Sequence, residues 1–527
     1  MRPKRDGYRQ GLILLLVILV LAASGCGMMK SYQQVMAEKQ AKYPDINLTQ
    51  RISLKELRED LGKLITTLEA VHPHPYTVLS RKSFHDSLER LNQSLGGDAT
   101  AKTAATPGPS KAQAAPTPSG MAAITVRDFY LKLAPLLTAL EQDYTCLLFP
   151  DSAYRAFQSR NGKLFPFEVA VAGEKLKVKT NYSSKPIAPG AEIESINGVP
   201  AGGIITDLLR YCEGSTLSLR RQRLSMKFQA LLWLVYDFQE PYTISIETRW
   251  VPVSGVTSAE ILEAQRRRSK NTAIPDGVDY QPLGEAVGLL TISNFNEEDF
   301  SLKLQNIFAG IAQSRIKDLI VDLRDSRGGG PPQVGQFADY FLDRPYVTIS
   351  GMEQKRSQQY DQQLKSLYYW WAWPVLRLHP STKAYFQTQA GQIAFLTMAP
   401  RNPKPLKPRF KGKIYVLIGP NTNSAGTEFA TVIKDYRAGV LIGQTTGASA
   451  NEYGNPYEFI LPHSHLRVSA ATSFYIRPSG DRKPGGVTPD IEVALTPDEN
   501  ESSPDPLAQD PVLETAKKII ALDRKKI

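Results

Sequence analysis

The sequence predicts an α/β fold, because short apolar runs alternate with helical patterns along its C-terminal half. Residues 287–292 and 316–323 are apolar enough to form buried strands, and helices are expected over 300–313 and 334–342. The chain has 527 residues, of which 42% are hydrophobic, so it can bury several cores. Its length favours roughly two to four domains. We place the α/β core at residues 280–495.

A small helical domain is expected over residues 51–150. Ser53 opens a capping-box pattern, and leucines then recur at helical spacing. Further helices are expected over 82–95 and from Val126 onward. Between them, residues 96–120 are rich in Ala, Pro, Thr and Gly. This composition cannot pack a core and predicts a disordered insertion.

Short strands and turns replace the helical pattern over residues 160–250. The segment IAPGAEIESINGV at 187–199 is similar to the strand and turn of a PDZ domain. The alternative is an ordinary hairpin, since Asn-Gly is common in hairpin turns. We favour the PDZ-like interpretation, in which a peptide can add as an extra strand at an exposed edge.

The first 25 residues have the pattern of a signal peptide. A basic start is followed by an apolar run from Leu12 to Ala23, too short to span a membrane comfortably. Small residues precede Cys26 and together resemble a bacterial lipobox, in which the cysteine carries lipid. The alternative is ordinary cleavage near Gly25. We expect a lipid-anchored, extracytoplasmic protein of the cell envelope, with residues 26–50 as a polar spacer.

The net charge is +11, and much of the excess lies in short clusters at residues 2–9, 266–268 and 525–526. No basic stripe with interleaved aromatic residues is present, so nucleic acid is not an expected partner. Proximity to an anionic envelope surface fits the charge better. Cys146 and Cys212 are expected to be buried small hydrophobes rather than a disulfide framework.

The strand expected at 414–418 leads through a turn to Ser424, at the start of a helical pattern. A strand fixes the position of such a serine, and the helix N-terminus offers N–H groups to an anion that forms beside it. The alternative is a simple N-cap serine. Upstream, glycines 328–330 lack the Gly-Lys-Ser/Thr ending of a phosphate loop, but they would let backbone N–H groups face an oxyanion.

Four segments together resemble the C-terminal processing, or tail-specific, serine peptidase family, which includes the tricorn-core proteases. They are VDLRDSRGGG at 321–330, NTNSAGTEFA at 421–430, RAGVLIGQTTGASA at 437–450 and GGVTPDIEV at 485–493. The resemblance implies a ClpP/crotonase-like protease core that follows an N-terminal helical domain and an inserted PDZ-like domain. It also implies a polypeptide substrate, and neither a cofactor nor a metal. Residues 496–527 would form an acidic, proline-containing linker and a C-terminal helix.

By this resemblance Ser424 is the nucleophile. The N–H groups of Ala425 and of Gly328 or Gly329 would form the oxyanion hole. Glu428 lies one helical turn after Ser424 and is expected either to orient neighbouring groups or to be a solvated helical glutamate.

The general bases of the family are replaced in this sequence. Tyr144 stands at the histidine position of one branch, and Ser449 at the lysine position of the other. Lys483 stands at the position of a distant glutamate, by ungapped extension from the segment at 485–493.

Two hypotheses follow from these replacements. In the first, Lys483 is desolvated in the cleft, which lowers its pKa, and it serves as the base for Ser424 in a serine peptidase. In the second, the chain is a pseudo-peptidase that binds peptide ligands as an envelope lipoprotein. A weaker third hypothesis is an acyl transferase or esterase on the same scaffold. The aromatic stretch 368–373 either packs as core or lid, or contacts substrate or a membrane surface.

Overall fold

The computed structural model describes five stretches of the chain, which are residues 43–97, 123–269, 277–403, 408–493 and 510–525. The expected signal peptide, Cys26 and nearly all of the 96–120 insertion lie outside these stretches. Within them, no helix is both long and apolar enough to cross a membrane.

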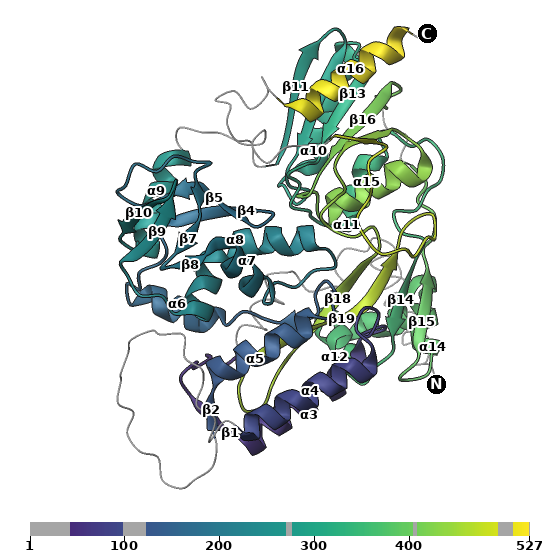
Figure 1. Ribbon diagram of the computed structural model, residues 1–527. Helices are drawn as coiled ribbons and strands as arrows, with labels where there is room; N and C mark the ends of the chain where they lie inside the picture. Colours follow the sequence, from purple (N-terminus) through teal and green to yellow (C-terminus); the bar gives the residue numbers. More distant parts are fainter. Residues whose placement is uncertain (1–42, 98–122, 270–276, 404–407, 494–509, 526–527) are drawn as a thin grey trace, which may run out of the picture.

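The N-terminal part is helical, as Figure 1 shows in purple and blue. Its elements are β1 (Arg51–Ser53), α3 (Leu54–Val71), α4 (Arg81–Gly97), β2 (Ala123–Thr125) and α5 (Val126–Thr138). The expected capping box is present. The Oγ of Ser53 accepts from the N–H of Glu56 at 3.4 Å, and the Glu56 carboxylate accepts from the N–H of Ser53 at 2.9 Å. The leucines of α3 pack into a core with α4 and α5.

The middle part has a core of its own, built from two small sheets and two helices. The strands are β4 (Phe167–Ala172), β5 (Lys175–Asn181), β6 (Glu192–Ile193), β7 (Ser195–Ile196), β8 (Val199–Pro200), β9 (Tyr242–Ile246) and β10 (Arg249–Val253); the helices are α7 (Ala201–Leu209) and α8 (Leu217–Tyr236). The hairpin between β7 and β8 turns at Asn197 and Gly198, whose φ angles are +50° and +81°. Both values are positive, as a two-residue hairpin turn of this hand requires. The PDZ-like interpretation stays a prediction.

The C-terminal part contains a six-stranded sheet in the order β11-β12-β13-β16-β17-β20. Its strands are β11 (Val278–Gly284), β12 (Val287–Ile292), β13 (Asp318–Asp322), β16 (Lys413–Ile418), β17 (Val440–Gly443) and β20 (Ile491–Glu492). From β12 to β20 every pair is parallel. One face is covered by α10 (Phe300–Gln313), α11 (Pro331–Ala338) and α15 (Ala425–Tyr436), and the other by α16 (Pro511–Lys525) (Figure 1). The predicted α/β fold class is confirmed.

A second sheet joins this core to the helical part. It comprises β14 (Gly351–Lys355), β15 (Ile393–Thr397), β18 (Glu452–Ile460) and β19 (Arg467–Ile476), and β3 (Cys146–Leu147) pairs with β19. Three α-helices and a 3-10 turn are inserted between β14 and β15. These are α12 (Gln358–Leu367), η1 (Trp370–Ala372), α13 (Trp373–Leu378) and α14 (Pro380–Gln387).

The predicted bounds of one core helix were wrong. The helix expected over 334–342 begins at Pro331 and ends at Ala338. Gly330 is its N-cap and Pro331 takes the first helical position, where a missing N–H costs nothing. Cys146 and Cys212 are free and buried, as the sequence predicted.

Candidate active site

Ser424 stands between β16 and α15 in a strained backbone conformation. Its φ is +47° and its ψ is −119°, which costs a residue with a side chain about 1–3 kcal/mol. Ser424 is the N-cap residue of α15, but its side chain makes no capping hydrogen bond to the helix. The turn before it is held by Thr422, whose Oγ accepts from the N–H of Gly419 at 3.0 Å and donates to the carbonyl of Leu323 at 2.8 Å. The surrounding fold therefore imposes the geometry of Ser424.

The glycine loop after β13 lies directly against Ser424. A Cβ on Gly328, whose φ is +97°, would lie 2.6 Å from the Cβ of Ser424 and 3.1 Å from its Oγ. Only glycine fits at this approach. Within the described residues, the N–H groups of Gly328, Gly329 and Ala425 make no hydrogen bond. They are available donors beside the serine, the arrangement that an oxyanion hole needs.

Hydrogen bonds fix the glycine loop from both sides. The N–H of Phe295 donates to the carbonyl of Gly328 at 2.9 Å, and the N–H of Gly330 donates to Asn296 Oδ1 at 2.8 Å. Ser326, at the family's asparagine position, is fully buried, and its carbonyl accepts from the N–H of Asn423 at 3.0 Å. A backbone hydrogen bond therefore fixes the glycine loop against the turn that contains Ser424.

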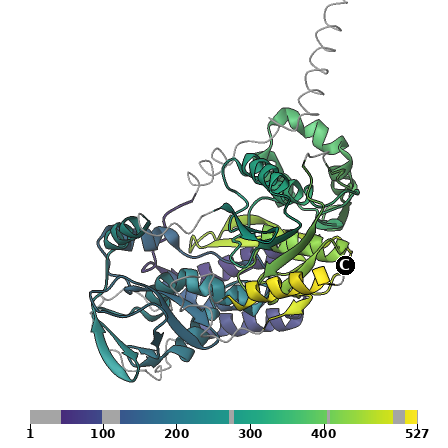
Figure 2. The same ribbon diagram turned by 90° about the horizontal axis from the view of Figure 1, so that it is seen from above.

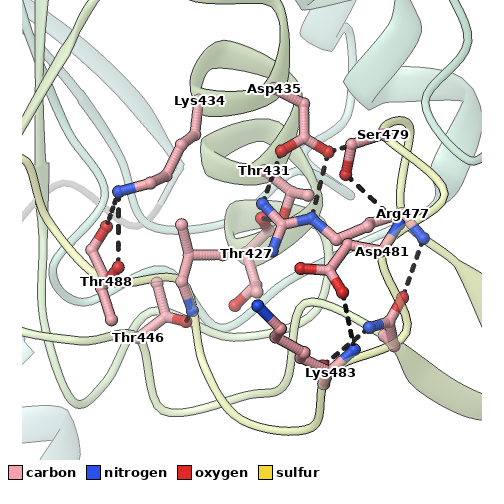
Figure 3. A network of polar contacts seen from close by, with 12 residues as sticks. Thr427, Thr431, Lys434, Asp435, Thr446, Arg477, Ser479, Asp481, Lys483 and Thr488 are labelled. Atoms are coloured by element: carbon pink, nitrogen blue, oxygen red, sulfur yellow. Dashed lines mark hydrogen bonds and ion pairs between the residues drawn. The ribbon is translucent and has the colours of Figure 1, made fainter.

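Two sequence-predicted candidates for the base do not fit that role. Ser449 is buried, and its Oγ donates to the carbonyl of Gly485 at 3.1 Å. Lys483 is exposed, which corrects the expectation that it is desolvated in the cleft. Its backbone N–H donates to Asp481, its carbonyl accepts from Asn451, and its amine ends without a polar partner in Figure 3. The reason is local, because residues 480–484 form an exposed turn.

Tyr144 occupies a turn just before β3, with a φ of +59°. Its carbonyl accepts from the Oγ of Ser469 on β19 at 2.7 Å, and 37% of its surface is exposed. The negative charge of Glu452, and then burial, raise the pKa of its phenol to about 12. The neighbouring Asp143 is buried, and its carboxylate accepts from the Oγ of Ser215 at 2.7 Å.

Two carboxyl groups, those of Glu428 and Glu452, interact near the start of α15, and the positive charge of Arg223 acts on Glu452 in the opposite direction. Glu428, on the first turn of α15, donates its N–H to the carbonyl of Ser424 at 2.8 Å. Burial raises the pKa of its carboxyl to about 7, although a hydrogen bond with Thr348 opposes the shift. Burial, with the charges of Asp143 and Glu428, raises the pKa of Glu452 to about 8. Among the described residues, neither glutamate forms an ion pair with Lys or Arg.

One tyrosine on β19 shows that these groups converge. Burial raises the pKa of Tyr475, and the charges of Glu452, Glu428 and Tyr144 raise it further. Glu452 pairs with Tyr475 in the β18–β19 register. The two glutamates and Tyr144 are thus close enough to Tyr475 for their charges to act on it.

The histidines are engaged elsewhere. His72 is buried and contacts Thr145 Oγ at 3.1 Å, and burial lowers its pKa to about 3. His74 contacts Glu353 at 2.7 Å. In the part of the chain that the structure describes, no hydrogen bond links a histidine to Ser424.

The helix α8 reaches the serine turn from the middle domain. Thr216 Oγ, at its N-cap, donates to the carbonyl of Gly447, and Ser218 Oγ donates to the carbonyl of Pro420 at 3.4 Å. Asn423 Nδ2 donates to Gln222. The middle domain therefore borders the site.

Comparison with known proteins identifies the core. Residues 286–493 match the model of peptidase family S41. The core of this chain is a peptidase family S41 domain. It contains the glycine loop, Ser424, both glutamates and Lys483. The predicted family is confirmed, and with it the serine peptidase class of the core.

Solved structures resemble most of the chain, including parts outside the S41 core. A mutant of CPAF is 15% identical, with 84% of this chain and 94% of that chain covered, at a TM-score of 0.52. Mature CPAF complexed with lactacystin is 15% identical, with 83% and 94% covered, at a TM-score of 0.51. At this identity the likeness shows a shared fold. A photosystem II D1 C-terminal processing protease has a TM-score of 0.41, with 14% identity and 87% and 95% covered. No curated protein sequence matches the chain.

Sequence reasoning missed Glu452. Its only local signal is an acidic residue three positions after Ser449, where strand β18 begins. The importance of Glu452 depends on the pairing of β18 with β19, which places it near Tyr144 and Glu428. No local pattern predicts that pairing.

Proposed function

We propose that this chain is a serine peptidase of the cell envelope that cleaves unstructured or tail segments of proteins through an acyl-enzyme on Ser424. The observation that carries the proposal is the strained Ser424 beside the free N–H groups of Gly328 and Ala425, within an S41 core. The strain holds the Oγ in place, and the donors stabilise an oxyanion.

The base that we propose is the half-buried pair of Glu428 and Glu452, in place of Lys483. A carboxylate with a pKa near neutral accepts the proton of Ser424 Oγ as the oxygen bonds to the scissile carbonyl carbon. The carboxylic acid then protonates the leaving amine as the C–N bond breaks. Water attacks the ester in the second half, the same carboxylate takes its proton, and the resulting acid returns that proton to Ser424 Oγ as the ester C–O bond breaks. Tyr144 lies in the same region, and its phenol stays neutral throughout.

The substrate and location follow from the remaining expectations. An S41 core implies a polypeptide substrate, and the PDZ-like domain would hold an extended segment beside Ser424, since α8 borders the serine turn. The signal pattern and Cys26 support an extracytoplasmic protein attached to the membrane by an N-terminal lipid. We infer no nucleic-acid partner.

The test is hydrolysis of a fluorescent, unstructured polypeptide by the chain and by its Ser424→Ala variant. Loss of hydrolysis in the variant, with an unchanged thermal midpoint, is the expected result. Equal rates for both proteins would refute the role of Ser424. A Ser218→Ala variant is the matched control, because it removes a hydroxyl that only borders the turn.

A pseudo-peptidase that binds peptides is the second candidate. Two observations favour it, namely Tyr144 in place of an imidazole and the Ser449 hydroxyl bound to a backbone carbonyl. It predicts peptide binding without cleavage by either protein. Fluorescence anisotropy of the labelled peptide, read together with its integrity by mass spectrometry, distinguishes the two functions.

A further inference from the structure

The helices inserted between β14 and β15 expose one apolar face. Trp370 and Leu378 are 87% and 77% exposed, whereas Ala372 and Leu376 between them are buried. Trp370 lies in η1 and Leu378 ends α13, and both side chains are exposed to solvent, whereas Ala372 and Leu376 face the core. We call Trp370, Leu378 and the exposed cations around them the platform.

The platform carries charge of one sign. Residues 362–392 contain no Asp or Glu. Lys365, Arg377 and Lys383 are exposed. The charged ends of Lys365 and Arg377 lie 5.8 and 6.0 Å from the ring centre of Trp373. These contacts keep positive charge beside the aromatic residues.

The platform rests on a hydrophobic core of its own and on a hydrogen bond to strand β18. Tyr360, Tyr385, Ala394 and Leu396 form a small core beneath it. Gln363 of α12 also donates to the carbonyl of Pro456 on β18 at 3.0 Å. In Figures 1 and 2 the inserted helices lie at the end of the molecule away from the β4–β10 domain. Neither this core nor this position serves the site at Ser424.

We propose that the platform docks on an anionic phospholipid surface, with Trp370 and Leu378 at the boundary of headgroups and acyl chains. Tryptophan prefers this depth, and each Lys or Arg near an anionic membrane adds attraction. A charge of one sign around an apolar pair complements such a surface better than it does a protein of mixed charge.

The position of the chain entry supports a lipid surface. The first described residue, Tyr43, donates from its Oη to Glu458 at 3.0 Å, two residues from the Pro456 that holds α12. An extended chain from Cys26 to Tyr43 reaches up to about 55 Å. A lipid on Cys26 and the platform can therefore engage one membrane together. This argument rests on the proposed envelope location, whereas the exposed face and its charge do not.

The experiment is flotation with vesicles, using the chain without residues 1–26, which keeps every described residue and removes the expected lipid. Vesicles of phosphatidylcholine alone are compared with vesicles that contain phosphatidylglycerol, at about 0.1 M and about 1 M salt. We expect binding to the anionic vesicles at low salt. Changing Lys365, Arg377 and Lys383 to Gln should weaken it about fivefold for each charge.

The apolar contribution is tested by Trp370→Ser with Leu378→Ser, which should weaken binding about tenfold or more. Trp250→Ser is the matched control, because Trp250 is 60% exposed on β10 and should not affect binding. Lack of vesicle binding, equal binding to neutral vesicles, or an equal loss with Trp250→Ser would each overturn the proposal. Ser424→Ala should bind vesicles normally, so this test stays separate from that of the peptidase.

Discussion

Gly328→Ala tests the proposed oxyanion hole most directly. The added Cβ would lie 2.6 Å from the Cβ of Ser424, whereas carbon atoms in contact prefer about 3.5–4.0 Å. The loop must therefore move by roughly 1 Å. Loss of one oxyanion donor lowers turnover by about 10²–10³-fold, and a displacement of about 1 Å alone can cost about 10²-fold. We expect kcat to fall at least about 100-fold.

The assay is the turnover number on the fluorescent polypeptide, measured together with the thermal midpoint. Gly391→Ala is the matched control, because Gly391 has a φ of +86° and no atom within 4 Å of an added Cβ. Both variants carry the backbone cost of about 1–2 kcal/mol, and Gly328→Ala adds the cost of its clash, so its midpoint should fall further than that of Gly391→Ala. Only Gly328→Ala should lose turnover. Unchanged turnover in Gly328→Ala would refute the placement of the oxyanion hole.

Three further predictions follow from the charged groups. If Glu428 shares the role of base, kcat/KM should rise as pH increases through about 7, because only the ionised carboxylate accepts a proton. The Glu428→Gln variant should then alter or abolish this rising part of the pH–rate profile. Lys483→Met should keep turnover within about twofold of the unaltered chain, because its amine is exposed; an abolished rate would restore it as the base. The two carboxylate oxygens of Asp510 accept hydrogen bonds from the guanidinium of Arg324 at 2.8 and 2.5 Å. Burial acts to raise the pKa of Asp510, but these contacts with Arg324 outweigh it, so the pKa is lowered. The ion pair therefore stabilises the fold above the pKa of the unfolded state, and this stabilisation is lost as pH falls through the pKa of the folded state. Asp510→Asn should lower the free energy of unfolding by about 1–3 kcal/mol at pH 7, and by less in acid, as measured by thermal unfolding. A loss of stability that does not depend on pH would contradict the assignment.

Sequence patterns over a few neighbouring residues correctly predicted the elements that form through contacts between such neighbours. The helix over 300–313 has the expected bounds, a C-terminal helix forms within 496–527, and the capping box of Ser53 forms as expected. Ser424 and the glycine loop were placed by motif, and the structure brings them into contact.

The surroundings of the serine depend on long-range pairing, which no local pattern encodes. The sequence predicted Lys483 as a base only because it lies at a fixed distance before the segment at 485–493. That distance does not show whether the side chain is buried or exposed. Glu452 gains its importance only because β18 pairs with β19 and brings it towards Tyr144 and Glu428. These are contacts between distant parts of the chain, so the sequence predicted that Ser424 starts a helix after a strand but not which groups surround it.

The energetics of the site favour catalysis over binding alone. A positive φ at Ser424 costs about 1–3 kcal/mol, and a glycine there would relieve the strain. Burial raises the carboxyl pKa values of Glu428 and Glu452, so near neutral pH their ionisation weakens the fold, which Gln in their place would avoid. A cleft that only holds peptide needs neither feature. The proposed peptidase would use both, because the strain would position the nucleophile and the raised carboxyl pKa values would supply a base that works near pH 7.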